Sequence, residues 1–220
     1  MAIAFYKGRL TMQELSIGSI EDYFSTPWDF GNQVLYDLCS ENPFHTDDEV
    51  IIAKTLFIGR IYAAAIERGR KKANYTETGD NLYITTVVNL FKKSDLDNEL
   101  KLISNKKLNA GSINDLLRIH KKLVDMLKTI TGQEKRSFAS KYLHFHFPDL
   151  FFIYDSRAIE SIEKYFDKGN HKAYPYLFDL YDVKYAEFFC KCYELQKKIK
   201  SMVTCPDKIT PRVIDNFLIR

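Results

Sequence analysis

Lys141 and Asp155 are two opposite charges in an otherwise apolar and aromatic segment of the chain. Between Phe138 and Pro148 the apolar side chains recur at helical spacing, and proline ends helices, so the pattern predicts a buried helix that carries Lys141. Burial lowers the pKa of a lysine because the charged form loses its hydration, and a neutral amine is a nucleophile. Lys141 is therefore a candidate nucleophile.

Asp155 follows an extended apolar run, 150–154, and precedes Ser156 and Arg157 at the start of a further predicted helix. Asp is a preferred N-cap residue, because its carboxylate accepts the free N–H groups of the first helical turn. An amine on one helix and a carboxylate at the start of the next can converge on one cleft, as a lysine nucleophile assisted by an acid requires. The alternative roles are structural: an N-cap for Asp155 and an ion pair for Lys141.

Two further residues, His144 and Arg157, are candidates for assisting roles in the same segment. His144 lies three residues after Lys141, and residues three apart share a helix face, so His144 is expected to tune or relay a proton of the lysine. His146 is expected to point elsewhere. Arg157 is an auxiliary candidate because it follows Asp155 closely. For each histidine the alternative is a structural role.

Basic residues in a predicted loop indicate contacts with nucleic acid. The densest cluster, Arg68-Gly-Arg-Lys-Lys72, follows a predicted helix, where cationic side chains can reach phosphates. The candidate phosphate-contacting residues are Arg68, Arg70, Lys71, Lys72 and Arg136. The alternative is a solvated helix end whose cations complement the helix dipole. The formal charge of +3 permits nucleic-acid binding without requiring it.

Tryptophan and cysteine are expected to be structural in this chain. Trp28, the single tryptophan, stands near a predicted helix start and is expected to pack, with stacking on a nucleobase as the alternative. The four cysteines show neither Cys-x-x-Cys spacing nor a histidine at a zinc-site interval, so we expect buried, reduced thiols. The cysteines are Cys39, Cys190, Cys192 and Cys205.

The elements that must position Lys141 and Asp155 are all predicted to be helices. The segment 83–91 has a β-branched, strand-like composition, yet its apolar positions also suit a buried helix, and every neighbour is helical. The predicted helices begin near Ser19 and then occupy about 27–40, 46–66, 83–91, 95–103, 113–130, 138–147, a segment after Asp155, 174–202 with a break near Asp182, and a last segment from Thr210.

Capping signals define several of these helix ends. Thr46-Asp-Asp-Glu is a capping box at the start of the helix predicted for 46–66. Ser112 is the predicted cap of the helix at 113–130, and Gly132 is expected to adopt the left-handed conformation in the turn that follows. The helices on either side of this turn form a candidate hairpin, and its second helix carries Lys141.

This order of helix, turn, lysine-bearing helix, extended apolar run and aspartate resembles the helix-hairpin-helix DNA glycosylases, most of all the 8-oxoguanine DNA glycosylase branch. The resemblance covers about residues 112–166. Lys141 matches the family's lysine nucleophile, and Asp155-Ser-Arg-Ala matches the Val-Asp-x-His/Arg motif around its aspartate. The resemblance implies an all-α, two-lobed helical fold and a duplex DNA partner with an extruded base.

The resemblance also implies an activity and its residues. It implies a DNA glycosylase with AP lyase activity on a damaged or modified, 8-oxoguanine-like base, acting through a Schiff base on Lys141 while Asp155 assists base departure. No metal or organic cofactor is implied. Asn216 and Phe217 on the last helix would line the base pocket.

One departure from the family pattern leaves a second interpretation open. The family carries Gly-x-Gly before its lysine, whereas this chain has Phe138-Ala139-Ser140 there, and its nearest glycine is Gly132. The missing glycines favour a catalytically inactive helical module of the same fold, which binds nucleic acid or protein.

The bulk composition limits the class of protein. With 220 residues and 45% hydrophobic content, the chain can bury a large core, and residues 1–220 are expected to form a single helical domain. No apolar run is long enough to cross a bilayer and no leader sequence is evident, so a cytoplasmic location is expected. The sequence contains no Ser-His-Asp order, phosphate loop, dinucleotide fingerprint or HExxH motif.

Overall fold

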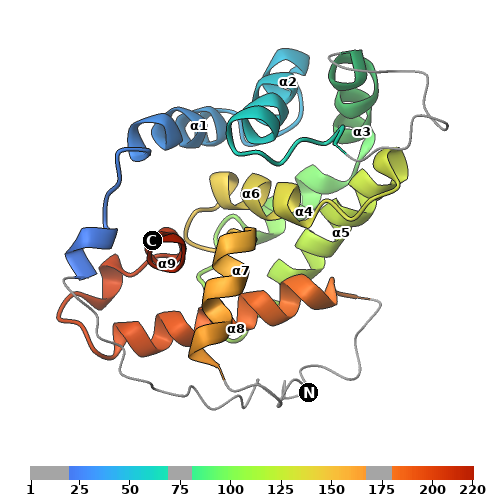
Figure 1. The fold of residues 1–220 in the computed structure, drawn as a ribbon. Helices are drawn as coiled ribbons and strands as arrows, with labels where there is room; N and C mark the ends of the chain where they lie inside the picture. Colours follow the sequence, from blue (N-terminus) through green and yellow to red (C-terminus); the bar gives the residue numbers. More distant parts are fainter. Residues whose placement is uncertain (1–19, 69–80, 167–179) are drawn as a thin grey trace.

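The computed structural model describes residues 20–68, 81–166 and 180–220, and every regular element in these ranges is helical (Figure 1). In chain order they are the 3-10 helix η1 (Ile20–Tyr23), the α-helices α1 (Asp29–Glu41) and α2 (Asp48–Leu56), the π-helical segments η2 (Phe57–Ile61) and η4 (Leu82–Val87), then α3 (Val88–Lys93), α4 (Leu96–Ile103), α5 (Ile113–Thr131), α6 (Arg136–His146), α7 (Ser156–Ile162), the 3-10 helix η5 (Glu163–Tyr165), α8 (Val183–Lys200), the 3-10 helix η6 (Pro206–Lys208) and α9 (Pro211–Ile219). The all-α prediction is confirmed. Within the described ranges, no helix has the length and apolar character needed to span a membrane.

Helix α6 is the central element of the fold, and it packs against α1, α5 and η2 (Figure 1). Helix α7 packs against α8 and α9, and α9 in turn contacts η1. The lysine-bearing helix α6 and the Asp155-capped helix α7 are therefore held by different neighbours. The short extended segment between α6 and α7 sets the position of one relative to the other.

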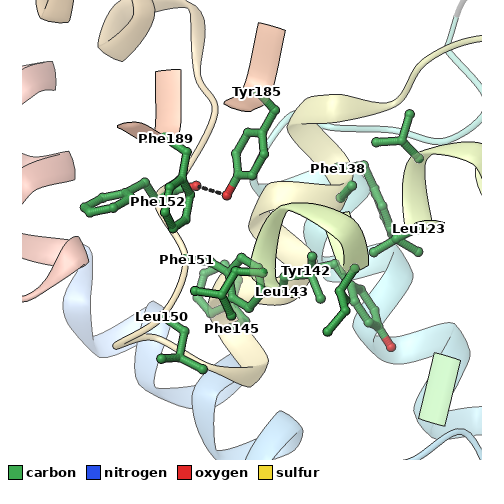
Figure 2. Packing of buried hydrophobic residues seen from close by; sticks show 14 of the residues in the cluster. Leu123, Phe138, Tyr142, Leu143, Phe145, Leu150, Phe151, Phe152, Tyr185 and Phe189 are labelled. Atoms are coloured by element: carbon green, nitrogen blue, oxygen red, sulfur yellow. Dashed lines mark hydrogen bonds between the residues drawn. The ribbon is translucent and has the colours of Figure 1, made fainter. Parts of the chain in front are cut away.

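Aromatic side chains clamp that extended segment in the core. Phe151 and Phe152 are both buried, and Figure 2 shows Phe152 against Tyr185 and Phe189 of α8. The Tyr185 hydroxyl donates a hydrogen bond to the Phe152 carbonyl oxygen at 3.0 Å. Each of these buried aromatic side chains contributes about 1.5–3 kcal/mol by leaving water. This burial fixes the chain just before Asp155.

The turn between α5 and α6 has the predicted conformation. Gly132 has φ 67°, in the left-handed region that glycine adopts without a Cβ penalty, and its N–H donates to the Lys128 carbonyl at 2.8 Å. The Thr131 hydroxyl donates to the Leu127 carbonyl at 2.8 Å and accepts from the Gln133 N–H at 3.1 Å. The helical hairpin predicted from the sequence is therefore formed.

The helix predicted for 46–66 is wrong at both ends. Its N-cap is Asp47 rather than Thr46, because the Asp47 carboxylate accepts from the Val50 N–H at 3.1 Å. The α-helix ends at Leu56, η2 follows, and Ala63 has a left-handed φ of 54°. The apolar pattern continues through this break because the irregular residues are also packed into the core, so periodicity alone does not reveal it.

The other helix predictions agree with the structure more closely. The segment 83–91 is helical, since it lies in η4 and α3. The break near Asp182 is the start of α8, where the Asp182 carboxylate accepts from the Tyr185 N–H at 3.0 Å. Residues 174–179 lie outside the described ranges. The Thr210 hydroxyl caps α9 by accepting from the Val213 N–H at 3.4 Å, as the sequence predicts.

Two predictions about single side chains are wrong. Cys205 is exposed, whereas Cys39, Cys190 and Cys192 are buried, and all four thiols are free. Trp28 is 77% exposed instead of packed. It stands at the N-cap of α1, before the first helical turn, so the periodicity of the helix does not assign it to the buried face.

Candidate lysine and aspartate site

The structure brings Lys141 and Asp155 together, with 3.5 Å between Lys141 Nζ and Asp155 Oδ2. Lys141 lies in the middle of α6 with 8% of its side chain exposed, and Asp155 stands at the N-cap of α7 with 28% exposed. Their charges meet at the point where the extended segment leaves the core. The convergence expected from the sequence is therefore present.

A backbone carbonyl freed by the end of η2 completes the polar surroundings of Lys141. Lys141 Nζ donates to the Tyr62 carbonyl oxygen at 2.9 Å. In an uninterrupted α-helix this carbonyl would accept from the N–H of Ile66, four residues later. The left-handed Ala63 prevents that bond by turning the chain out of the helix. The helix break, which the sequence does not reveal, thus supplies a hydrogen-bond acceptor to the Lys141 amine.

Burial lowers the pKa of Lys141 below its ordinary value of 10.5, because the ammonium form loses its hydration. The negative charges of Asp155 and Asp215 act in the opposite direction, and the cation of Arg157 adds to the lowering. Burial prevails, so the amine of Lys141 loses its proton more readily than a solvent-exposed lysine does. This is the change that a nucleophilic lysine needs.

The two carboxylate oxygens of Asp155 have different partners: one caps α7 and the other faces Lys141. Oδ1 accepts from the Arg157 N–H at 3.0 Å, which is the N-cap bond, while Oδ2 faces Lys141. The capping role and the pairing role are therefore both present in the one side chain. The cap holds the carboxylate in place and leaves the second oxygen available to the amine.

Helix α9 adds Asp215 and Arg212 to the site, and the sequence interpretation missed both. Burial raises the pKa of Asp215 to about 6, the charge of Asp155 raises it further, and the cations of Arg212 and Lys141 oppose this rise. Arg212 Nη1 donates to Asp215 Oδ2 at 2.6 Å, and Arg212 Nη2 lies 3.6 Å from Asp29 Oδ1. The available signal was the three-residue spacing of Arg212 and Asp215 on a helix with a buried apolar face.

The two histidines of α6 are engaged away from Lys141. His144 Nδ1 lies 2.8 Å from the Phe151 carbonyl oxygen and Nε2 lies 2.7 Å from the Tyr36 hydroxyl. Burial lowers the pKa of His144 to about 4, so it is neutral at physiological pH. His144 therefore holds the extended segment on α6. His146 Nε2 lies 3.1 Å from the buried amine of Lys54.

The candidate phosphate-contacting residues are only partly described by the structure. Arg136 Nε donates to both carboxylate oxygens of Asp182, at 2.7 and 2.6 Å, and its Nη2 pairs with Glu134. Two acids thus occupy Arg136, which joins the start of α6 to the start of α8. Arg68 is exposed, and its carbonyl accepts from the Lys135 amine. Arg70, Lys71 and Lys72 lie outside the described residues.

A pocket of about 250 Å³ lies beside the site. Arg157, which follows the Asp155 cap, and Arg212, which pairs with Asp215, both line it. Its lining residues are Thr26, Pro27, Trp28, Arg157, Arg212, Asn216, Ile219 and Arg220. Of the two residues that the resemblance assigns to a base pocket, Asn216 lines this one, whereas Phe217 packs edge-on against Tyr23 at 5.3 Å.

A second cluster of chemically capable residues is buried between α4, α6 and the loop before α2. His45 Nδ1 pairs with Asp97, and His45 Nε2 lies 2.5 Å from the Tyr142 hydroxyl. Aspartate, histidine and a hydroxyl in this order have the composition of a catalytic relay. His45 and Tyr142 are both buried, however, and only the Asp97 side chain is partly exposed, so the histidine and the hydroxyl are closed to a substrate.

Comparisons of the chain with protein-family models, with curated proteins and with solved structures give no match. Among the described residues, no group of His, Cys, Asp and Glu side chains has the arrangement of a metal site.

Proposed function

We propose that this protein is a DNA glycosylase with AP lyase activity, which acts on a damaged or modified, 8-oxoguanine-like base through a Schiff base on Lys141. The observation that carries the proposal is the meeting of a buried lysine of lowered pKa with the Asp155 carboxylate, 3.5 Å from Nζ. The hairpin of α5 and α6 with the lysine on its second helix is the arrangement that the resemblance implies.

The proposed chemistry begins with loss of a proton from the Lys141 ammonium, which its burial favours. The neutral amine attacks the sugar C1′ atom, the glycosidic C–N bond breaks, and the base leaves with the bonding electrons and takes up a proton. Asp155 stabilises the positive charge that develops on the sugar, because its Oδ2 faces the reacting amine. The attached nitrogen then loses a proton, its electron pair forms the C=N bond as the C1′–O4′ bond breaks, and O4′ takes up a proton, which gives the protonated Schiff base.

Attack requires the amine to exchange one partner for the substrate. Lys141 Nζ is bonded to the Tyr62 carbonyl, and its side chain is less exposed than that of Asp155. The amine must release this carbonyl and turn toward the exposed edge of Asp155. The side chain of lysine has four rotatable bonds, so this movement needs no change in the position of α6.

Borohydride trapping tests the proposal directly. The protein is incubated with duplexes that carry 8-oxoguanine or an abasic site, reduced, and analysed for a covalent adduct. We expect an adduct with the wild-type protein and none with Lys141→Gln. Asp155→Asn keeps the cap and removes the charge, and it is expected to slow adduct formation about a hundredfold.

Lys54→Gln is the matched control, because Lys54 is also buried and its pKa is also lowered by burial. Its amine faces the Asn42 carbonyl and His146, and no carboxylate in the described part of the chain bonds to it. Folded Lys54→Gln, verified by circular dichroism, is expected to retain the adduct. An adduct that persists in Lys141→Gln would exclude Lys141 as the nucleophile.

The second candidate function is a catalytically inactive module that binds nucleic acid. It is favoured by the low exposure of Lys141 and by the bond from its amine to the Tyr62 carbonyl, since both oppose contact between Nζ and a substrate. This alternative predicts that the protein binds duplex DNA and forms no adduct with either substrate. The trapping experiment combined with a gel-shift measurement therefore separates the two functions.

A further inference from the structure

Three buried polar atoms that have no hydrogen-bond partner among the described residues gather at the pocket beside the site. They are Thr26 Oγ1, Arg212 Nε and Asn216 Oδ1, and all three residues line the pocket. In the described part of the chain only two other side-chain atoms share this condition, and they lie elsewhere. An unsatisfied buried polar group costs about 1–3 kcal/mol, so their concentration at one pocket indicates a place where a ligand supplies the missing partners.

Asn216 defines one part of that ligand. Its residue is 1% exposed, and its Nδ2 donates to the Tyr23 carbonyl oxygen at 2.9 Å. This bond fixes the orientation of the amide, so Oδ1 is presented as an acceptor. An acceptor requires an N–H or O–H donor, which a phosphate dianion lacks. The ligand is therefore more than a bare anion.

The arginines at the pocket indicate a second group of the ligand, which is an anion. Arg157, Arg212 and Arg220 line the pocket, and no acidic residue is among the described lining residues. Arg212 bonds to Asp215 through Nη1 and retains its free Nε. Arg220 donates to the backbone carbonyls of Asp22 and Ser25, and no ion pair joins it to a carboxylate of the described residues. Guanidinium groups bind phosphate by forked hydrogen bonds, which favours an anionic group here.

Trp28 indicates a third group of the ligand, which is a flat ring that can stack on the indole. It lines the same pocket and is 77% exposed, which is unusual for a tryptophan and leaves the ring available for stacking. The volume of about 250 Å³ equals that of roughly eight water molecules. This space suits a ligand about as large as one nucleotide unit rather than a larger one.

We infer that this pocket binds a nucleoside monophosphate unit. The base stacks on Trp28 and donates to Asn216 Oδ1, and the phosphate lies against the guanidinium groups of Arg157 and Arg220. The unit comes from a nucleic-acid strand or from a free mononucleotide, since both offer the same groups. The inference rests on the proposed function in one respect, since the resemblance also assigns Asn216 to a base pocket, but it does not require Lys141 to be reactive.

Trp28 provides the probe, because it is the only tryptophan in the chain. The full-length protein is titrated with deoxyguanosine monophosphate, deoxyguanosine, inorganic phosphate and a short single-stranded oligonucleotide, followed by tryptophan fluorescence and by calorimetry. We expect saturable quenching by the mononucleotide, with deoxyguanosine and phosphate binding at least about tenfold more weakly. Binding of the oligonucleotide alone would assign the unit to a strand and supports the inference.

Two results of these titrations would overturn the inference. One is phosphate binding as tightly as the mononucleotide, which would make the pocket a simple anion site. The other is absence of binding by both nucleotide probes. Neither measurement involves a Schiff base, so failure here leaves the borohydride result intact, and failure of trapping leaves this result intact.

Substitutions then locate the binding. Arg157→Ala removes an exposed side chain and is expected to weaken mononucleotide binding about tenfold, and Trp28→Ala, followed by calorimetry, is expected to weaken it to a similar degree. Arg118→Ala is the matched control, because Arg118 is an exposed arginine on α5 that pairs with Glu99. Wild-type affinity in Arg157→Ala and Trp28→Ala would place the ligand elsewhere.

Discussion

Lys141 and Lys191 are both buried lysines on helices, with side chains 8% and 1% exposed. Lys191 Nζ lies 2.6 Å from Glu163 Oε1 and 2.9 Å from Glu187 Oε1. Burial lowers the pKa of Lys191, but its hydrogen bonds to the two carboxylates outweigh burial and raise the pKa above 10.5. Lys141 faces one carboxylate at a longer distance and a neutral carbonyl, and its pKa is lowered.

Burial by itself therefore does not make a lysine reactive in this fold. Coulomb attraction rises as distance falls, so two carboxylates within hydrogen-bond distance hold the proton on Lys191. The single carboxylate near Lys141 does not offset the lost hydration. Lys54 shares a lowered pKa, yet it is enclosed in the core. Lys141 alone of these three combines a lowered pKa with a nearby carboxylate and an adjoining pocket.

The largest expected loss of stability comes from removing the carboxylates that pair with Lys191, which makes its surroundings more like those of Lys141. Glu163→Gln with Glu187→Gln removes both carboxylates from a fully buried amine, so the pKa of Lys191 should fall below 10.5. Loss of a partner from a buried ion pair costs about 3–5 kcal/mol. Because these carboxylates are partly exposed, we expect a loss of about 2 kcal/mol in the free energy of unfolding, measured by urea denaturation.

Glu194→Gln is the control for this comparison. Glu194 pairs at 3.1 Å with Lys197, whose side chain is 55% exposed, and such surface pairs contribute about 0–1 kcal/mol. The control should therefore lose less than about 1 kcal/mol. Equal losses in the double variant and the control would show that Lys191 does not depend on its carboxylates.

An intermediate effect is expected from the pH dependence of the Lys141 site. The pKa of Asp215 in the folded protein, about 6, lies above the ordinary 3.8, so the folded state binds the proton more tightly than the unfolded chain. Asp215 therefore adds stability as the pH falls through 6, and this contribution is lost as the pH rises. From about pH 7 to about pH 5 the gain is about 1 kcal/mol.

Asp215→Asn tests this contribution, because the amide does not titrate. Urea denaturation at both pH values should show that the variant lacks the gain of about 1 kcal/mol relative to wild type. Neutral buried histidines such as His144 have the opposite effect, because they destabilise the folded protein on acidification. They are present in both the variant and the wild type, so their effect cancels in the difference between the two. Parallel pH profiles of variant and wild type would contradict a raised pKa for Asp215.

Effects on stability of about the same size or smaller separate the two roles of Asp155. Asp155→Ala removes the N-cap of α7 and should cost about 1 kcal/mol of stability, whereas Asp155→Asn keeps a capping oxygen and should cost only a few tenths. Both variants should lower the pKa of Lys141 further, because its nearest negative charge is gone. Thermal melting and NMR titration of the lysine amines measure the two effects. Similar melting temperatures for both variants would exclude the capping role.

Much of the fold is predictable because its signals are local. The left-handed turn at Gly132, the hydroxyl cap at Thr210 and the cap at Asp155 each depend on residues a few positions apart. The helical spacing of apolar residues places Lys141 on a buried helix for the same reason. These signals also predict the order of lysine helix, extended segment and capped helix.

Other features depend on contacts between distant segments. The break after η2 presents the Tyr62 carbonyl to Lys141, 79 positions further along the chain. The chain before and after this break is equally apolar, so the pattern predicted a continuous helix. Asp215 and Arg212 likewise reach the site only because α9 packs against α7.

The sequence by itself determined that the chain is helical, that Lys141 is buried and that Asp155 caps the next helix, because propensity, periodicity and capping act over a few residues. Only the tertiary structure decided that the two charges meet, that Lys191 keeps two carboxylates while Lys141 has one, and that Trp28 stands at a pocket with Asn216. Burial and distance between charges set the pKa values, and both are properties of the packed chain.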